Sequence, residues 1–183
     1  MEQIINQAVE VLRSGGTILY PTDTIWGIGC DARNAEAVER LYAIKERDRT
    51  KSMLVLVASG RWSKVDGNNL RPTTYILPRS VWQDEMLLNV APNLPADDGT
   101  LGVRVPRHAF CQEVIRRLGA PLVSTSANLS GRPSPRGYGE IEEELKLRVD
   151  YCVPPLPEFL SGETSGSRIV KMNPDGSETL IRP

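Results

Sequence analysis

The chain has few of the residues from which metal centres and covalent catalytic sites are usually built. It contains one histidine, His108, and three cysteines, which stand far apart at Cys30, Cys111 and Cys152 without any C-x-x-C spacing. A structural zinc site needs about four such ligands close together, so we expect no protein-based metal site. An odd number of widely spaced cysteines also indicates unpaired thiols in a reducing compartment, and we expect a cytoplasmic protein.

Several longer signals are missing as well. No apolar run reaches the ~18 residues that indicate a membrane span, and the start, Met1–Asn6, lacks the basic and apolar regions of a signal peptide. The sequence contains no P-loop motif, no Rossmann glycine fingerprint and no nucleophile elbow. A nucleotide site in this chain would therefore rest on side chains more than on a glycine-rich backbone cradle.

The charge is close to balanced. Lys and Arg number 22 against 23 Asp and Glu, for a formal net charge of -1. The whole chain is therefore not a polycation, and nucleic-acid binding would need a local basic patch. The hydrophobic content of 40% and the charged content of 25% are those of an ordinary folded protein. We predict a single domain over residues 1–183, which is long enough for a substantial core.

The sequence does contain alternating helical and strand patterns. Apolar residues at helical spacing predict helices at residues 3–14, 35–44, 107–118 and 139–147. Short apolar runs predict strands at residues 17–20, 53–58, 73–77, 101–105, 121–123, 168–172 and 178–182. The last two strands flank Asn173-Pro174-Asp175-Gly176, which is a strong signal for a hairpin turn. We predict an α/β fold with a twisted mixed β-sheet flanked by helices.

The first polar cluster is Lys45-Glu46-Arg47, at the end of the helix that Asn34 is placed to cap. Because the helix dipole favours cations at a C-terminus, one interpretation is an exposed basic helix end. The other is a site that neutralises a polyphosphate. Residues i and i+2 do not share a helix face. If both cations contact one ligand, the chain must therefore leave the helix near Ile44.

The second polar cluster, Ser124-Thr125-Ser126 with Asn128, directly follows the apolar strand predicted at 121–123. One interpretation is a helix cap or an Asx turn, which these residue types form readily. The other is a ligand site, because one cap needs only one hydroxyl. Ligands in open α/β sheets bind at the carboxyl ends of strands, where this cluster is predicted to lie.

Two further polar features lie at or near strand ends. The segment Thr22-Asp23-Thr24 follows a predicted strand and forms either a capped turn or part of a pocket. Arg104 lies between two valines in another predicted strand. An unpaired buried charge is costly, so Arg104 needs a partner. That partner is either a structural salt bridge or the carboxylate or phosphate of a ligand.

Four motifs in a fixed order resemble a known family. They are P-T-D-T-I-W-G at Pro21–Gly27, K-E-R at Lys45–Arg47, G-V-R-V-P at Gly102–Pro106 and S-T-S-A-N-L-S-G at Ser124–Gly131. Together they resemble the YrdC/TsaC family of threonylcarbamoyl-AMP synthases, and the resemblance covers most of the chain. A K-x-R motif alone would carry almost no information, whereas four motifs in order make the resemblance specific.

This resemblance implies a YrdC-like open α/β fold and a nucleotidyltransferase. The implied reaction forms threonylcarbamoyl-AMP and pyrophosphate from L-threonine, bicarbonate and ATP. It also implies that Mg²⁺ is held mainly by the phosphates, as is common for this ion. Downstream tRNA-modifying proteins would use the adenylate to make threonylcarbamoyladenosine in tRNA. The protein would act without crossing or binding a membrane.

The resemblance also implies roles for particular residues. The implied catalytic residues are Lys45 and Arg47. The implied nucleotide contacts are Lys45, Arg47, Ser126, Asn128 and Ser167, and we expect further nucleotide contacts from Ser124 and from Arg168, where the chain departs from the family pattern. The implied threonine contacts are in the segment with Thr22 and Thr24, with Thr24 favoured for a direct contact, and we expect Arg104 and Ser126 to contact the same substrate.

The residues leave two other functions open. One is a protein that binds double-stranded RNA or tRNA without catalysis, through the basic residues at 45–51. The other is a nucleotide-binding regulatory module without turnover. The chain also departs from the family pattern in its shorter segment 59–71, and in Ser167-Arg168-Ile169, where Ser-Thr followed by Val or Ile is usual. The loop at 132–136 is a candidate lid.

Overall fold

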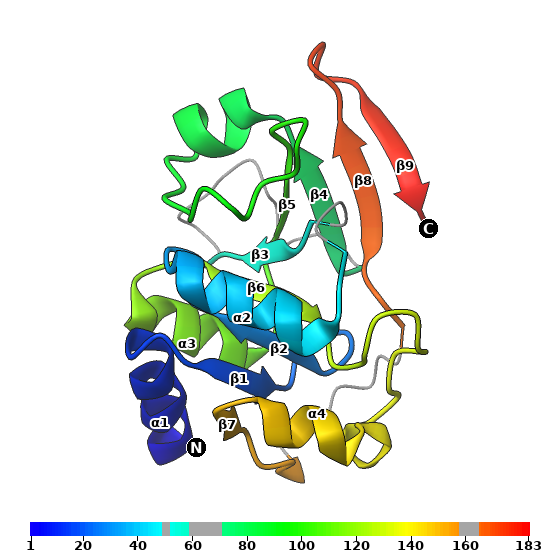
Figure 1. The fold of residues 1–183 in the computed structure, drawn as a ribbon. Helices are drawn as coiled ribbons and strands as arrows, with labels where there is room; N and C mark the ends of the chain where they lie inside the picture. Colours follow the sequence, from blue (N-terminus) through cyan, green and yellow to red (C-terminus); the bar gives the residue numbers. More distant parts are fainter. Residues whose placement is uncertain (49–51, 59–70, 158–164) are drawn as a thin grey trace.

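The computed structural model describes residues 1–48, 52–58, 71–157 and 165–183. Their main feature is a nine-stranded sheet in the order β7-β1-β2-β6-β3-β5-β4-β8-β9 (Figure 1). The strands are β1 (Thr17–Tyr20), β2 (Gly27–Cys30), β3 (Leu54–Leu56), β4 (Thr73–Leu77), β5 (Leu101–Arg104), β6 (Leu122–Ser126), β7 (Tyr151–Cys152), β8 (Arg168–Met172) and β9 (Glu178–Arg182). The helices are α1 (Glu2–Arg13), α2 (Ala35–Lys45), α3 (Ala109–Leu118), α4 (Glu143–Arg148), the π-helix η1 (Ser80–Glu85) and the 3₁₀-helix η2 (Tyr138–Glu140).

The strand directions make the sheet mixed. β6 runs antiparallel to both of its neighbours, β2 and β3, whereas β3 and β5 are parallel. At one edge, β8 and β9 form the predicted antiparallel hairpin, and β8 runs parallel to β4. Figure 1 shows α1, α2 and α3 gathered around β1, β2 and β6, with the β8–β9 hairpin at the opposite end. The predicted α/β fold with a mixed sheet flanked by helices is confirmed.

β2 is a strand that the sequence does not predict, because glycine weakens strands. Two of its four residues are glycine, and the backbone needs one of them here. A Cβ atom at Gly29 would lie 1.9 Å from the carbonyl oxygen of Val123 in β6. The close approach lets Gly27 pair with Ser126. The pairing brings the segment after β1 next to the second polar cluster.

β6 is longer than predicted. The expected strand ends at residue 123, but β6 continues to Ser126, because Ser124 pairs with β3 and Thr125 pairs with Ile28 of β2. The prediction that the polar cluster follows the strand is therefore wrong for its three hydroxyl residues. They form the second half of the strand, where the pleat points alternate side chains to the same face.

Two helix ends are set by capping residues, and one predicted helix is interrupted. The side chain of Asn34 caps α2 by accepting the amide of Ala37 at 3.0 Å. Gly119 ends α3 in the left-handed region, at φ 70. The single helix predicted at 139–147 is wrong, because Ile141 is extended and separates η2 from α4.

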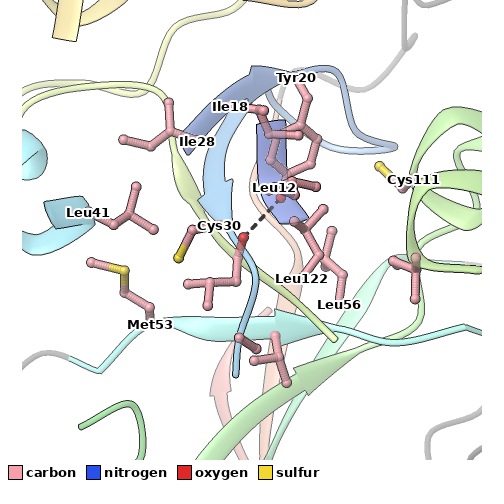
Figure 2. Close-up of a cluster of buried hydrophobic side chains, with 14 of the residues drawn as sticks. Leu12, Ile18, Tyr20, Ile28, Cys30, Leu41, Met53, Leu56, Cys111 and Leu122 are labelled. Carbon is pink, nitrogen blue, oxygen red and sulfur yellow. Dashed lines mark hydrogen bonds between the residues drawn. The ribbon is translucent and has the colours of Figure 1, made fainter. Parts of the chain in front are cut away.

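The core packs on both sides of the sheet. In Figure 2, Leu41 and Met53 lie to one side of β2, and Cys111 lies to the other, beyond Tyr20. Cys30 and Cys111 are free and buried, and burial raises the pKa of Cys30 to about 12. They act as small core side chains. None of the described helices is long and apolar enough to span a membrane.

Candidate functional site

A cavity of about 310 Å³ lies against one face of the sheet. Residues two apart in a strand share a face, and the cavity is lined by such pairs, with Gly102 and Arg104 from β5 and Thr74 and Ile76 from β4. The cavity therefore extends over the face of the sheet, beyond the strand ends at which the sequence places it. Its described lining residues are Thr22, Thr24, Ile25, Trp26, Gly27, Arg47, Ser52, Met53, Leu54, Thr74, Ile76, Gly102, Arg104, Ser124, Thr125, Ser126, Ser134, Gly166, Ser167, Ile169 and Arg182.

Thr22, Thr24 and Arg104 meet at one side of this cavity. The guanidinium of Arg104 donates from Nη1 to Oγ1 of Thr24 at 2.9 Å, and both residues are buried. Oγ1 of Thr22 accepts the amide of Thr24 at 3.0 Å and donates to the carbonyl of Ile25 at 2.8 Å. The segment is therefore both a capped turn and part of a cavity wall, so both of its sequence interpretations apply.

Arg104 is buried beside a carboxylate that only partly satisfies it. It is 3% exposed, and its Nη2 lies 3.5 Å from Oδ1 of Asp23. Its Nε has no hydrogen-bond partner among the residues that the structure describes. A buried donor without a partner is costly, and the cost is higher for a charged group. The guanidinium of Arg104 therefore brings a positive charge that Asp23 only partly compensates to this side of the cavity.

Lys45 is the last residue of α2 and is only 1% exposed, so the interpretation as an exposed helix end is wrong. Its ammonium donates to the backbone carbonyls of Ser126, at 2.7 Å, and of Asn128, and lies 3.4 Å from Oδ1 of Asn128. Burial and the nearby Arg47 lower the pKa of Lys45 to about 8. Lys45 therefore ties the two polar clusters together.

Glu46 separates the two motif cations by ending the helix. It adopts a left-handed conformation, with φ 50, directly after Lys45. The chain thus leaves the helix next to Ile44, as two cations directed at one site would require. Arg47 beyond the turn lines the cavity and donates from Nη2 to the carbonyl of Ser52 at 3.0 Å.

The S-x-N pair divides in the same way. Ser126 lines the cavity, whereas Asn128 is not among the lining residues. The amide of Asn128 donates to the carbonyls of Leu129, at 3.0 Å, and Arg132, at 2.6 Å. These local bonds are of the kind that Asn makes in turns. We call the buried pair Lys45 and Asn128 the clamp, and the cavity-lining pair Arg47 and Ser126 the wall.

The C-terminal hairpin supplies another part of the cavity. Ser167 lines it, and its hydroxyl lies 2.7 Å from that of Thr74. Arg168 does not line it, because adjacent strand residues face opposite sides of a sheet. Arg182 of β9 lines the cavity and donates from Nε to the carbonyl of Ser167 at 2.9 Å. Gly166 leaves room for it, since a Cβ there would lie 2.8 Å from Nη2 of Arg182.

The lining of the cavity is positively charged and rich in hydroxyls. Three guanidinium groups line it, those of Arg47, Arg104 and Arg182, and the described lining residues include no Asp or Glu. Guanidinium groups bind carboxylates and phosphates through two parallel hydrogen bonds. The cavity is therefore suited to a ligand that carries several anionic oxygens.

Residues 10–183 match the model of the Sua5/YciO/YrdC family, which is described as "Telomere recombination". The chain belongs to this family. It is 36% identical over 171 residues to the threonylcarbamoyl-AMP synthase of Xanthomonas campestris pv. campestris (strain B100), a match that covers 88% of this chain and 87% of the relative.

Two solved structures share the fold of this family member. E. coli YciO has a TM-score of 0.76 at 26% identity, over 100% of this chain and 89% of that chain. P. abyssi Sua5 complexed with L-threonine has a TM-score of 0.79 at 24% identity, over 100% of this chain and 54% of that chain. The chain thus spans about half the length of that Sua5.

The cavity of this family member collects most of the residues that the sequence singles out. Those on its surface are Thr22, Thr24, Arg47, Arg104, Ser124, Ser126 and Ser167. Those not on its surface are Lys45, Asn128 and Arg168. Lys45 still contacts the wall, because its ammonium donates to the carbonyl of Ser126, and it also donates to the carbonyl of Asn128. Arg168 lies at the start of β8, where its backbone amide donates a hydrogen bond to the carbonyl of Pro72 at 2.9 Å.

The polar cavity residues that sequence reasoning missed include Ser52, Thr74, Ser134 and Arg182. Ser134 lies in the loop that the sequence marks as a candidate lid, so its place in the lining fits that idea without testing it. Arg182 carried a usable signal, because it lies in the returning strand of a predicted hairpin whose other strand begins next to Ser167. The strand pairing of Arg182 with Ile169 brings its side chain there.

Proposed function

We propose that this chain is an L-threonylcarbamoyladenylate synthase, which forms threonylcarbamoyl-AMP and pyrophosphate from L-threonine, bicarbonate and ATP. The observation that carries the proposal is the family membership, together with relatives at 30% to 36% identity that are named threonylcarbamoyl-AMP synthase. They identify a nucleotidyltransferase-type enzyme that acts in tRNA modification. The cavity chemistry supports the same reaction, because its substrates carry a carboxylate, a carbonate and a triphosphate.

The charged groups of the cavity suggest how the substrates are arranged. We place the carboxylate of L-threonine at Arg104 and Thr24, because both line the cavity and the Arg104 charge is only partly compensated by Asp23. We place the triphosphate between Arg47, Ser126 and Arg182 on the other sides of the same cavity. In this arrangement the carboxylate of L-threonine and the triphosphate each meet a guanidinium. Lys45 acts on the triphosphate indirectly, by holding the Ser126 segment.

The reaction then proceeds in two steps. The amine of L-threonine attacks the carbon of bicarbonate, and loss of water leaves an N-carboxylate. An oxygen of this carboxylate attacks the α-phosphorus of ATP, and the bond from phosphorus to the bridging oxygen breaks to release pyrophosphate. No covalent bond to the protein is needed. The described lining residues hold no carboxylate or imidazole base, so the enzyme acts by positioning and by charge stabilisation.

Mg²⁺ fits this cavity only as a companion of the triphosphate. The ion prefers oxygen ligands, chiefly carboxylates and phosphates. The described lining residues offer hydroxyls and no carboxylates, and no group of three or more His, Cys, Asp or Glu among the described residues could hold a metal. The phosphates would therefore supply most of its ligands, with hydroxyls or water completing the shell.

The proposed product is a reactive mixed anhydride, so other proteins must consume it soon after it forms. We propose that tRNA-modifying proteins in the cytoplasm transfer its threonylcarbamoyl group to adenosine. RNA binding without catalysis is not favoured, since the named relatives are synthases.

Pyrophosphate release tests the proposal. The assay contains purified protein, ATP, Mg²⁺ and bicarbonate, with and without L-threonine, and mass spectrometry identifies the nucleotide product. We expect release that depends on both L-threonine and bicarbonate, and a product with the mass of threonylcarbamoyl-AMP. Arg116→Ala, which breaks an exposed ion pair with Glu113 on α3, is the control and should leave the rate unchanged. Release that does not depend on L-threonine would overturn the assignment.

A further inference from the structure

The last four carbonyls of an α-helix have no hydrogen-bond partner within the helix. At the C-terminus of α2, each of these four carbonyls accepts a hydrogen bond from elsewhere. Two partners come from the turn itself, where the amide of Arg47 donates to Tyr42 at 3.1 Å and that of Glu46 donates to Ala43 at 3.2 Å. The carbonyl of Lys45 accepts the amide of Ser130 at 2.9 Å. The remaining carbonyl, of Ile44, accepts a hydrogen bond from a side chain outside the helix.

That side chain is Arg148, at the end of α4. Its Nη1 donates to the carbonyl of Ile44 at 3.3 Å and to Oε1 of Glu46 at 2.9 Å. Its Nη2 donates to Glu144 on its own helix. The guanidinium thus binds both the helix end and the side chain of the left-handed residue. It also places a cation at a helix C-terminus, where the dipole favours one.

In the K-x-R motif, the left-handed conformation of Glu46 turns the chain between Lys45 of the clamp and Arg47 of the wall. A residue with a Cβ atom enters this conformation at a cost in free energy, and it keeps it only where surrounding contacts hold it. Without the turn, Arg47 would continue the helix and would leave the cavity. The contacts from Arg148 hold the residue on which the placement of both motif cations depends.

We propose that Arg148 is a positioning residue of the active site, which acts through Glu46 to hold Lys45 in the clamp and Arg47 at the cavity. This inference rests on the proposed function for its kinetic test but not for its structural test. Arg148 is not among the residues that line the cavity and needs no contact with any substrate. Helix α4 thereby becomes part of the support of the catalytic pocket.

Glycine at position 46 gives a sharp test, because glycine adopts a left-handed conformation without strain. If Arg148 acts through this turn, Arg148→Ala should lower kcat/KM for ATP by about tenfold. The double variant Arg148→Ala with Glu46→Gly should recover most of the loss and should match Glu46→Gly alone, because a glycine turn does not need support from Arg148. Arg116→Ala, which removes another arginine ion pair from the surface, is the matched control and should show no loss. All variants are assayed well below their melting temperatures.

Hydrogen exchange supplies a readout that does not depend on catalysis. The amides of Glu46, Arg47 and Ser130 bond to the α2 carbonyls. They should exchange faster in Arg148→Ala, at the wild-type rate in the double variant, and unchanged in Arg116→Ala. If the wild type shows no threonine-dependent turnover, the proposed function fails while this measurement still decides the positioning role. Wild-type exchange in Arg148→Ala, or a kinetic loss that glycine does not recover, would overturn the inference.

Discussion

The wall and the clamp are built from the same two motifs but hold their residues in different ways. K-x-R gives Arg47 to the wall and Lys45 to the clamp, and S-x-N gives Ser126 to the wall and Asn128 to the clamp. Wall side chains face the cavity, whereas clamp side chains are buried and donate to backbone carbonyls of residues 126–132. Each motif therefore contributes one residue to the cavity lining and one to the structure behind it.

This difference predicts two kinds of variant. Removal of a wall group should reduce ligand binding and catalysis while the fold is retained, because a partly exposed cation contributes little to stability. Removal of a clamp group leaves buried carbonyls without a donor, which costs free energy of unfolding. Measurements of kcat/KM beside unfolding free energies can separate the two regions.

The largest effect is expected at Arg104, which belongs to both kinds, since it is buried and also lines the cavity. Arg104→Ala leaves Asp23 without its partner guanidinium and should lower the free energy of unfolding by about 3 kcal/mol. It should also lower kcat/KM by at least about 100-fold. Denaturant titration and pyrophosphate kinetics measure the two effects. Arg104→Lys keeps the charge, so it should lose less stability than Arg104→Ala. Equal stability of Arg104→Ala and the wild type would contradict this account.

The second prediction compares the effects of removing Lys45 and Arg47 on stability and on catalysis. Lys45→Ala removes a buried ammonium and its stem, and should lower the free energy of unfolding by about 3 kcal/mol. Arg47→Ala should change that quantity by less than about 1 kcal/mol, but should lower kcat/KM by roughly 100-fold. Thermal melts and steady-state kinetics on both variants give the comparison. If Lys45→Ala melts like the wild type, Lys45 does not form the clamp.

The third prediction repeats the comparison in the S-x-N motif. Asn128→Ala frees the carbonyls of Leu129 and Arg132 and should cost about 2 kcal/mol of stability. Ser126→Ala should leave stability within about 0.5 kcal/mol of the wild type, and should raise KM for ATP. The experiment is the same pair of melts and kinetics. Loss of stability in Ser126→Ala with normal kinetics would place Ser126 in the clamp instead.

Much of this architecture could be predicted from the sequence, but the directions of its side chains could not. Apolar runs predict most strands, and Asn173–Gly176 predicts the terminal hairpin, because these signals are local. β2 was missed, since its glycines serve a close approach to β6 that only the tertiary structure shows. The roles of Lys45 and Arg47 depend on a left-handed glutamate, which residue propensities do not indicate.

The smallest effect expected is a dependence of stability on pH that comes from Lys45. Its pKa is about 8 in the folded chain, against an ordinary value of 10.5 for a lysine side chain. Between these values the unfolded chain holds a proton that the folded chain has lost, so stability rises with pH. The contribution of Lys45 should therefore grow by about 1 kcal/mol from pH 8 to pH 9. Below about pH 7, where Lys45 is protonated in both states, it should be constant.

Lys45→Met isolates this contribution, because the variant keeps the side-chain volume and has no proton to lose. The quantity to plot is the difference in free energy of unfolding between the wild type and Lys45→Met. The titration of the buried cysteines and tyrosines cancels in this difference, because both chains contain them. Arg47 helps to lower the pKa of Lys45, so in Arg47→Ala the rise should begin at a higher pH. A difference between wild type and Lys45→Met that stays flat from pH 7 to pH 10 would mean that the ammonium keeps its proton throughout. The clamp would then be a permanent ion bound to carbonyls, and the distinction from the wall would rest on geometry alone.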